Sequence, residues 1–281
     1  MKNELKKTTK YALLDYDGFI CKAWYAALAR GDWDDAWNVL QDLKAAAIDK
    51  ARVYFKCEDV NVYCVTSGHS WKKDLYKSYK ANRERDEFLG AFRDEVQEND
   101  TCILKAHMME ADELIVMIVD TLELHDKSED CIVFSDDKDL HYVSKNWCKI
   151  NITEEVQKTE DNKDFLQQLL MGDRIDGISG IPKVGKATAK KILDQKVYDI
   201  ESVIRAYRDK EVTRELCVEN LILLIPMSYE YNEQKVLYEQ LTLKILKDNC
   251  DFKTSISIII QGLIDYVTKL VEKIYSENED N

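Results

Sequence analysis

Short apolar runs that end in polar or acidic residues alternate with longer helical segments in the first half of this chain. The runs YALLDYD, DVNVYCVTS and CIVFS begin at Tyr11, Asp59 and Cys131, and each fits a buried strand. Between them lie an alanine- and tryptophan-rich stretch near 21–55 and a segment over 109–124 with apolar residues at helical spacing. Strands alternating with helices predict a layered α/β domain with a mostly parallel sheet.

Strand signals largely stop after about Leu169, and the remainder of the chain reads as helical and charged. We therefore expect two parts: an α/β core over 1–171, with a charged arm at 70–100, and a helical part over 172–281. A chain of 281 residues is long enough for one large domain or two modest ones. Residues 200–281 match no functional motif.

The charge balance of the chain is acidic overall but uneven. A net charge of −13 counts against nucleic-acid binding if only the sum is considered. Residues 70–83 nevertheless carry five basic side chains against one acid, and residues 177–193 carry four and none. Both segments could contact phosphates.

The cysteines and apolar segments bear on location. The eight cysteines form no CxxC pair, which favours reduced thiols over a zinc or disulfide framework. The longest apolar runs are far shorter than the ~18 residues of a membrane span, and the N-terminus lacks the apolar part of a signal peptide. A cytoplasmic protein without membrane contact is expected.

Acidic residues recur where the predicted strands end and where helices begin. Ligands of open α/β sheets bind outside the carboxyl ends of the strands, so these acids are expected to meet in one cleft. Such carboxylates repel each other unless a cation neutralises them, and Mg²⁺ and Mn²⁺ prefer oxygen ligands. The candidate metal ligands are Asp15, Asp17, Glu110, Asp112, Glu113, Asp137, Asp139, Asp173 and Asp176.

Each acidic group taken alone also has a purely structural interpretation. Asp15, Asp17, Asp137 and Asp139 could form turns, the acids at 110–113 could stabilise the first turn of a helix, and Asp173 and Asp176 could be helix caps. The metal hypothesis depends on the coincidence and order of all four groups.

The segment GDRIDGISGIPKVGKATAKK, residues 172–191, specifies unusual backbone geometry through its glycines and proline. Gly180–Lys186 fits the spacing G-x-x-x-x-G-K of a nucleotide-binding P-loop, but the next residue is Ala187 and lacks the hydroxyl that would hold Mg²⁺. No buried strand precedes the loop. A nucleotide cradle is therefore rejected.

The motifs SWKKDLYKSYKANR, MEADE, SDDKDL and GDRIDGISGIPKVGKATA together resemble those of the 5′-nuclease superfamily. This superfamily includes flap endonucleases, the 5′-nuclease domain of bacterial DNA polymerase I and phage 5′→3′ exonucleases. The resemblance covers about residues 11–193. It implies a three-layer α/β/α nuclease core of the PIN-like type with a mostly parallel sheet, a helix–three-turn–helix DNA-binding element of helix-hairpin-helix type, and a helical C-terminal region.

The resemblance also implies roles for individual residues. Two Mg²⁺ or Mn²⁺ ions would be held by Asp15, Glu110, Asp112, Asp137, Asp139, Asp173 and Asp176. Lys80 and Arg83 would contact the scissile phosphate, and Tyr79 would stack on an unpaired base. DNA contacts are expected from Lys72, Lys73, Lys77, Gly180, Lys183, Gly185, Lys186 and Lys190, and a K⁺ ion is expected at the 177–185 turn.

Two positions depart from the pattern of the superfamily. Its members commonly have E-A-D-D where this chain ends the motif with Glu113. Many members also have an acid at the end of the second strand, where this chain has Thr66, Ser67 and Gly68. One metal site is therefore expected to differ in its ligands.

The sequence thus predicts a divalent-metal-dependent 5′→3′ exonuclease, with flap endonuclease activity as a related expectation. Its substrate would be duplex DNA with a 5′ end or flap, and its products would carry a 5′-phosphate. The location would be the cytoplasm of a phage host or bacterium. Two alternatives remain open: a ribonuclease acting on RNA or an RNA–DNA hybrid, and an inactive DNA-binding protein with the same scaffold.

Overall fold

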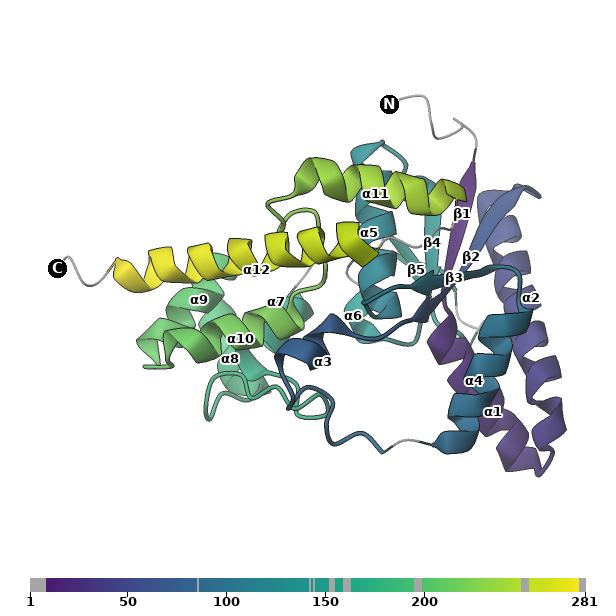
Figure 1. The fold of residues 1–281 in the computed structure, drawn as a ribbon, viewed down its shortest axis with the longest axis horizontal. Helices are drawn as coiled ribbons and strands as arrows, with labels where there is room; N and C mark the ends of the chain where they lie inside the picture. Colours follow the sequence, from purple (N-terminus) through teal and green to yellow (C-terminus); the bar gives the residue numbers. More distant parts are fainter. Residues whose placement is uncertain are drawn as a thin grey trace. The chain divides into compact units, whose positions relative to one another are not determined.

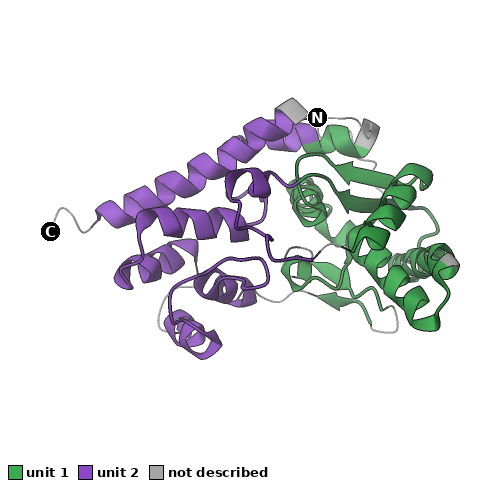
Figure 2. Cartoon of the chain, turned by 60° about the horizontal axis from the view of Figure 1, so that its bottom comes forward, with its two compact units in different colours: residues 1–69, 85–160, 242–251 green, residues 70–84, 161–241, 252–281 purple. Residues whose placement is uncertain are grey.

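The computed structural model describes residues 9–84, 86–141, 143, 145–151, 155–158, 163–194, 199–248 and 253–277. The chain divides into two compact units, shown in different colours in Figure 2. Unit 1 comprises residues 1–69, 85–160 and 242–251, and unit 2 comprises residues 70–84, 161–241 and 252–281.

This division differs from the boundary expected near Met171. The helix that ends at Met171 packs against later helices, so it belongs to unit 2 and the boundary falls before that helix. The expected arm at 70–100 is also divided, since residues 70–84 belong to unit 2 and the helix that follows belongs to unit 1.

Unit 1 is built on a six-stranded sheet with the order β3-β2-β1-β4-β5-β6. The strands are β1 (Lys10–Asp15), β2 (Val60–Ser67), β3 (Ile103–Ala106), β4 (Cys131–Phe134), β5 (Asn146–Cys148) and β6 (Gln157–Lys158). All neighbouring strands are parallel except β5 and β6. The expected mostly parallel sheet is confirmed, and the carboxyl ends of β1 to β5 lie at one edge.

Helices cover both faces of this sheet, which gives unit 1 three layers (Figure 1). On one face lie α1 (Tyr16–Arg30), α2 (Ala36–Phe55) and α4 (Glu87–Asn99), and on the other lies α5 (Ala111–Leu124). Two short 3₁₀ helices, η1 (Trp33–Asp35) and η2 (Ser128–Asp130), and the short helix α6 (Lys138–His141) complete the unit.

The alternation of side chains along β1 explains the layers. Ala12 and Leu14 belong to the buried cluster shared with α1, α2 and α4, while the intervening Leu13 is fully buried outside that cluster. A strand that is apolar on both faces needs helices on both faces. The apolar run in the sequence therefore encodes the layered fold.

Unit 2 is helical in its described part, as expected beyond Leu169. It contains α3 (Trp71–Leu75), α7 (Lys163–Met171), α8 (Lys186–Asp194), α9 (Ile200–Asp209), α10 (Arg214–Leu224) and α12 (Lys253–Ser276), and α12 packs against α9 and α10. Helix α11 (Lys235–Asp248) runs from unit 2 into unit 1. Among the described residues, no helix combines the length and apolar character required to cross a membrane.

Candidate active site

The carboxyl end of β1 is the topological centre of unit 1. The chain moves from β1 to β2 and β3 on one side and then returns to place β4 on the other side of β1. Such a reversal leaves a crevice at the carboxyl ends of the two central strands. Asp15 is the last residue of β1, and Ser135 follows β4 directly. The hydroxyl of Ser135 donates a 2.7 Å hydrogen bond to Oδ2 of Asp15.

The surroundings of Asp15 make its carboxyl group unusual. Removal from water raises its pKa to about 7; the hydrogen bond from Ser135 opposes this increase, and the nearby carboxylates of Asp17 and Asp137 add to it. Gly18 has no side chain, so the backbone there can pass close to Asp15 and Ile150. A Cβ at Gly18 would lie 2.8 Å from Cδ1 of Ile150 and 3.4 Å from Oδ2 of Asp15.

Asp17 reaches from the first turn of α1 to the end of β2. Its Oδ2 accepts a 2.9 Å hydrogen bond from the backbone N–H of Ser67, and its Oδ1 lies 2.6 Å from Nη2 of Arg93 on α4. Ser67 in turn accepts a 2.9 Å hydrogen bond from the N–H of Ala111 through its hydroxyl. The carboxylate of Asp17 thus lies at the end of β2, within hydrogen-bond distance of the Ser67 backbone.

The SDDKDL segment folds into a turn and the short helix α6. The N–H of Asp137 donates to Oγ of Ser135 at 2.9 Å, and the N–H of Asp139 donates to Oδ1 of Asp137 at 2.9 Å. Asp136 is held elsewhere, with its carboxylate 2.9 Å from Nζ of Lys22 and 3.0 Å from the N–H of Ile150. Asp136 is therefore engaged by groups other than those that contact Asp137 and Asp139.

The acids that begin α5 serve the helix itself. The side chain of Glu113 accepts a 3.0 Å hydrogen bond from the N–H of Glu110, and the Glu110 side chain accepts from the N–H of Glu113, which together form a capping box. Glu113 is 1% exposed. Asp112 also accepts a 2.8 Å hydrogen bond from the N–H of Glu113. The contacts of Glu113 therefore support its structural interpretation, in which it stabilises the first turn of the helix.

The donor groups around Asp15 suit a hard cation, although their contacts here are with one another and with basic side chains. Within the described residues, no three His, Cys, Asp or Glu side chains converge as a metal-holding group. Asp17 and Asp137 are still close enough to Asp15 to raise its pKa. Carboxylate oxygens are the ligands that Mg²⁺ and Mn²⁺ prefer.

In unit 2, Asp176 is the centre of a small ionic cluster with the YKANR motif. Arg83 forms an ion pair with Oδ1 of Asp176, and Nζ of Lys80 lies 3.8 Å from its Oδ2. The backbone N–H of Lys80 also donates to the carbonyl of Asp176 at 2.9 Å. The two motifs that the resemblance connects to the substrate phosphate and to a metal are therefore in direct contact.

Asp173 begins the turn that follows α7. Its Oδ1 accepts a 2.9 Å hydrogen bond from the N–H of Ile175 and a 3.4 Å hydrogen bond from that of Asp176. These contacts are typical of an acid that organises its own turn. Asp173 and Asp176 both belong to unit 2, whereas the other seven candidate ligands belong to unit 1.

The glycine-rich loop between α7 and α8 is a compact hairpin. Gly180 has a φ of 62°, and a Cβ there would lie 2.2 Å from the carbonyl carbon of Met171. The N–H of Ile181 donates to the carbonyl of Leu170 at 2.9 Å, which closes the hairpin. Lys183, Lys186 and Lys190 are exposed on its outer side and the start of α8. Their positions suit phosphate contacts.

The basic segment before the YKANR motif is more buried than its composition suggests. Lys73 and Lys77 are exposed, but Lys72 is 4% exposed and its Nζ donates a 3.1 Å hydrogen bond to the carbonyl of Leu223. Tyr79 is 4% exposed and packs against Ile178 and Leu223. In the structure Lys72 and Tyr79 therefore have internal packing roles, and the DNA contact expected of Lys72 and the base stacking expected of Tyr79 stay predictions.

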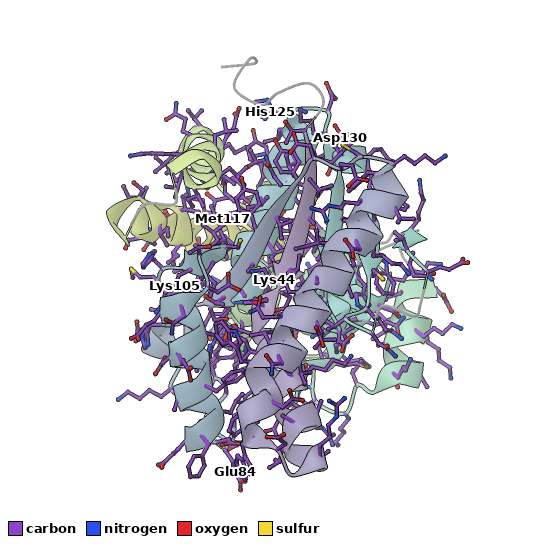
Figure 3. The ribbon with its side chains drawn as sticks, turned by 90° about the vertical axis from the view of Figure 1, so that its right-hand side faces the viewer. Lys44, Glu84, Lys105, Met117, His125 and Asp130 are labelled. Carbon is purple, nitrogen blue, oxygen red and sulfur yellow. The ribbon has the colours of Figure 1, made fainter. Side chains whose placement is uncertain are left out.

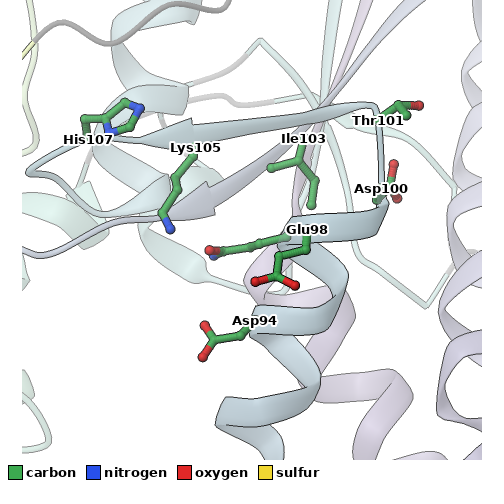
Figure 4. A pocket seen from close by; sticks show the side chains of 8 residues that line it. Asp94, Glu98, Asp100, Thr101, Ile103, Lys105 and His107 are labelled. Carbon is green, nitrogen blue, oxygen red and sulfur yellow. The ribbon is translucent and has the colours of Figure 1, made fainter.

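A cavity of about 500 Å³ lies beside the edge strand β3 (Figure 4). Asp94 and Glu98 line it from α4, Ile103 and Lys105 from β3, and Asp100 from the turn between them. Burial would raise the pKa of Asp100, but hydrogen bonds from Lys44, the Cys102 N–H and Tyr16 outweigh it and lower that pKa. One of the residues that line the cavity, Asp100, is therefore engaged in an ion pair with Lys44.

These features define an α/β nuclease-like fold with carboxylates at the carboxyl ends of its central strands. The T5 5′-exonuclease with bound zinc has a TM-score of 0.57 at 15% identity, over 94% of this chain and 99% of that chain. The bacteriophage T5 D15 flap endonuclease, in a complex with DNA and metal ions, has a TM-score of 0.55 at 14% identity, over 95% and 99%. The fold expected from the resemblance to the 5′-nuclease superfamily is confirmed.

The sequence comparison agrees with this resemblance over most of the chain. DNA polymerase I of Rhizobium leguminosarum is 25% identical over 240 residues, which are 75% of this chain and 23% of the polymerase. This chain thus spans about a quarter of the length of that relative. No protein-family model matches the chain.

Sequence reasoning missed Arg93, Ser67 and Ser135. Arg93 lies in a charged helix where nothing in the spacing distinguishes it from its neighbours. Ser135 stands directly before the acids of SDDKDL, so its position after a strand is a signal that could have been used. Ser67 stands at the end of β2, where only the absence of an acid was noted.

Proposed function

We propose that this chain is a divalent-metal-dependent 5′→3′ exonuclease with flap endonuclease activity on DNA. The observation that carries the proposal is the buried carboxyl of Asp15, whose pKa is raised by burial and by the carboxylates of Asp17 and Asp137, at the switch point of a fold shared with the T5 5′-exonuclease. The T5 structures are described with metal ions, and one of them with DNA. These descriptions support a metal ion as the cofactor and DNA as the partner, and Mg²⁺ or Mn²⁺ is proposed because the candidate ligands are carboxylates.

The residues of unit 1 would bind the metal cofactor and position it at the reacting phosphate. Asp15, Asp17, Asp137 and Asp139 are the proposed first ligands, with Glu110 and Asp112 as further ligands at the start of α5. When bound, two divalent ions supply the activation of a water and the stabilisation of the leaving oxygen. Ser135 fixes the orientation of Asp15 through its 2.7 Å hydrogen bond. Cleavage would leave a 3′-hydroxyl and a 5′-phosphate.

The residues of unit 2 would bind the substrate backbone. Lys80 and Arg83 are positive, and they are the proposed contacts to the scissile phosphate, where they would stabilise developing charge. Both side chains form ion pairs with Asp176. Asp173 and Asp176 stay proposed ligands of a second ion, as the resemblance implies, and K⁺ stays the proposed ion of the 177–185 turn.

The hairpin is the proposed grip on duplex DNA. The exposed residues at the start of α8 and three exposed lysines, Lys183, Lys186 and Lys190, suit contacts with phosphate oxygens, which carry no sequence information. This hairpin also favours DNA over the ribonuclease alternative. The acids grouped near Asp15 oppose the inactive-scaffold alternative, because a non-catalytic protein gains nothing from mutual repulsion.

The test is a substrate comparison with the full chain. Duplex DNA with a 5′ flap, an RNA–DNA hybrid and single-stranded RNA of matched length are incubated with Mg²⁺ and with EDTA. We expect cleavage of the DNA flap substrate only with Mg²⁺. Faster cleavage of the hybrid or of RNA would support the ribonuclease alternative, and binding without cleavage of any substrate would support the inactive scaffold.

A further inference from the structure

The contacts of Asp17 place a cationic side chain inside the carboxylate cluster. Both oxygens of Asp17 are engaged, one by the Ser67 N–H at 2.9 Å and the other by Nη2 of Arg93 at 2.6 Å. The side chains of Arg93 and Asp17 are 36% and 23% exposed. This partly buried pair therefore has more energetic weight than an exposed surface pair.

The helix turn that carries Arg93 is packed against α1, whereas one nitrogen of its guanidinium has no hydrogen-bond partner among the described residues. Its neighbours on α4, Phe92 and Val96, are buried, and Phe92 stacks on Trp24 of α1 at 5.7 Å between ring centroids. The Nε of Arg93 is buried without a hydrogen-bond partner in the part of the chain that the structure describes. Asp17 thus supplies the hydrogen-bonded anchor for a guanidinium whose Nε is without a partner among the described residues.

The charges near Asp17 explain why a cation is needed there. Asp17 and Asp137 both act on Asp15 electrostatically, so three carboxyl groups share the carboxyl ends of β1, β2 and β4. Like charges in a desolvated crevice destabilise each other unless a positive charge intervenes. Arg93 provides that charge from within the chain.

We propose that Arg93 is a built-in counter-cation of Asp17 that competes with a divalent ion for this carboxylate. The inference rests on the proposed function, because it takes the carboxylates near Asp15 to be metal ligands. Arg93 is then a positioning residue: it keeps Asp17 directed at the end of β2 while the ion is absent and weakens the binding of the ion that takes its place.

The test measures Mn²⁺ binding to the full chain by calorimetry, without any DNA. For Arg93→Gln we expect Mn²⁺ to bind roughly tenfold more tightly, since a charge-assisted hydrogen bond of about 1.5 kcal/mol no longer has to be broken. Arg93→Lys keeps the charge but loses the planar fork, so it should bind only a few-fold more tightly, about two- to threefold. Arg52→Gln is the matched control, because Arg52 pairs with the exposed Asp49 on α2 and its loss changes the net charge equally.

A double-variant cycle separates competition from a structural effect. In the Asp17→Asn background, Arg93→Gln should leave Mn²⁺ affinity unchanged, because the carboxylate that both cations share is gone. Unchanged or weaker binding by Arg93→Gln, or equal tightening in both backgrounds, would overturn the inference. If Arg93→Gln does not fold, as judged by circular dichroism, the same cycle with Arg93→Lys decides.

The proposed function can fail separately. Wild-type protein that binds Mn²⁺ but cleaves no DNA would contradict the nuclease proposal. The double-variant cycle would still measure whether Arg93 and Mn²⁺ compete for Asp17. Protein that binds no Mn²⁺, in wild-type form and as Arg93→Gln, would contradict both.

Discussion

The ion pair between Lys44 and Asp100 provides a sharp test of how unit 1 is held together. Nζ of Lys44 on α2 lies 2.7 Å from both carboxylate oxygens of Asp100, and Lys44 lies over the sheet in Figure 3. The hydroxyl of Tyr16 donates to the same carboxylate at 2.7 Å. Tyr16 stands between Asp15 and Asp17, so this network also fixes the start of the candidate site.

Asp100→Asn removes the negative charge and leaves Lys44 without its counter-ion. The two side chains are only 11% and 4% exposed, and removal of one partner from a buried pair costs about 3 kcal/mol or more. We therefore expect the free energy of unfolding of unit 1 to fall by about 3 kcal/mol near pH 7. The control is Asp49→Asn, whose pair with Arg52 is exposed and should contribute less than about 1 kcal/mol.

The pH dependence has a defined sign. The pKa of Asp100 is lowered in the folded state, so its ionised form stabilises the protein above the unfolded pKa of about 3.9, and this stabilisation is lost as the pH falls through the folded pKa. The difference between wild type and Asp100→Asn should therefore be largest near neutral pH and shrink in acid.

Urea unfolding followed by tryptophan fluorescence measures this difference, because Trp24, Trp33, Trp37 and Trp147 all belong to unit 1. Two results would refute the reasoning. One is a loss no larger than that of Asp49→Asn, and the other is a loss that stays constant from neutral pH into acid.

Three further changes test unit 2. Gly180→Ala should destabilise the hairpin by about 1–3 kcal/mol or more, because a φ of 62° and the nearby Met171 backbone exclude a Cβ at this position. Thermal unfolding measures the effect, and Gly185→Ala is the control because a Cβ at Gly185 would meet no atom within 4 Å. The double variant Lys183→Gln, Lys186→Gln should bind DNA of every sequence more weakly, and its slope of log affinity against log salt concentration should be shallower by about 1 per lysine. Fluorescence anisotropy across a salt series measures this slope, and an unchanged slope would contradict the prediction. Tyr79→Ala should cost about 3 kcal/mol of stability as a buried aromatic, and a stable variant with weaker binding only to unpaired DNA would restore the stacking interpretation.

The sheet of unit 1 could be predicted because its signals are local. The strands β1, β2 and β4 are apolar runs that no amphipathic helix would show, and the helices between them have helical spacing or strong helix formers. The division of the chain into two units could not be predicted from local sequence patterns. Residues 70–84 leave the core and 242–251 return to it, and both depend on tertiary packing that no local pattern encodes.

The candidate site could be predicted in its acids but not in its cations. Topology alone places Asp15 and Asp137 at the ends of neighbouring strands. Arg93 sits in a helix with many charges, and only the packing of Phe92 beside it directs Arg93 toward Asp17. The burial of Lys72 likewise depends on a carbonyl more than a hundred residues away, at Leu223.

We propose that a divalent ion held by the carboxylates at the switch point of unit 1 enables this chain to hydrolyse DNA from its 5′ end. The most direct measurement is digestion of duplex DNA labelled at the 5′ or the 3′ end, with and without Mg²⁺, by wild type, Asp137→Asn and Asp136→Asn. Asp136 is the matched control, because it adjoins the proposed ligand but pairs with Lys22. We predict metal-dependent release of the 5′ label as mononucleotides or short oligomers by wild type and Asp136→Asn, and none by Asp137→Asn. Equal activity of Asp137→Asn and wild type, or release of the 3′ label first, would contradict the account.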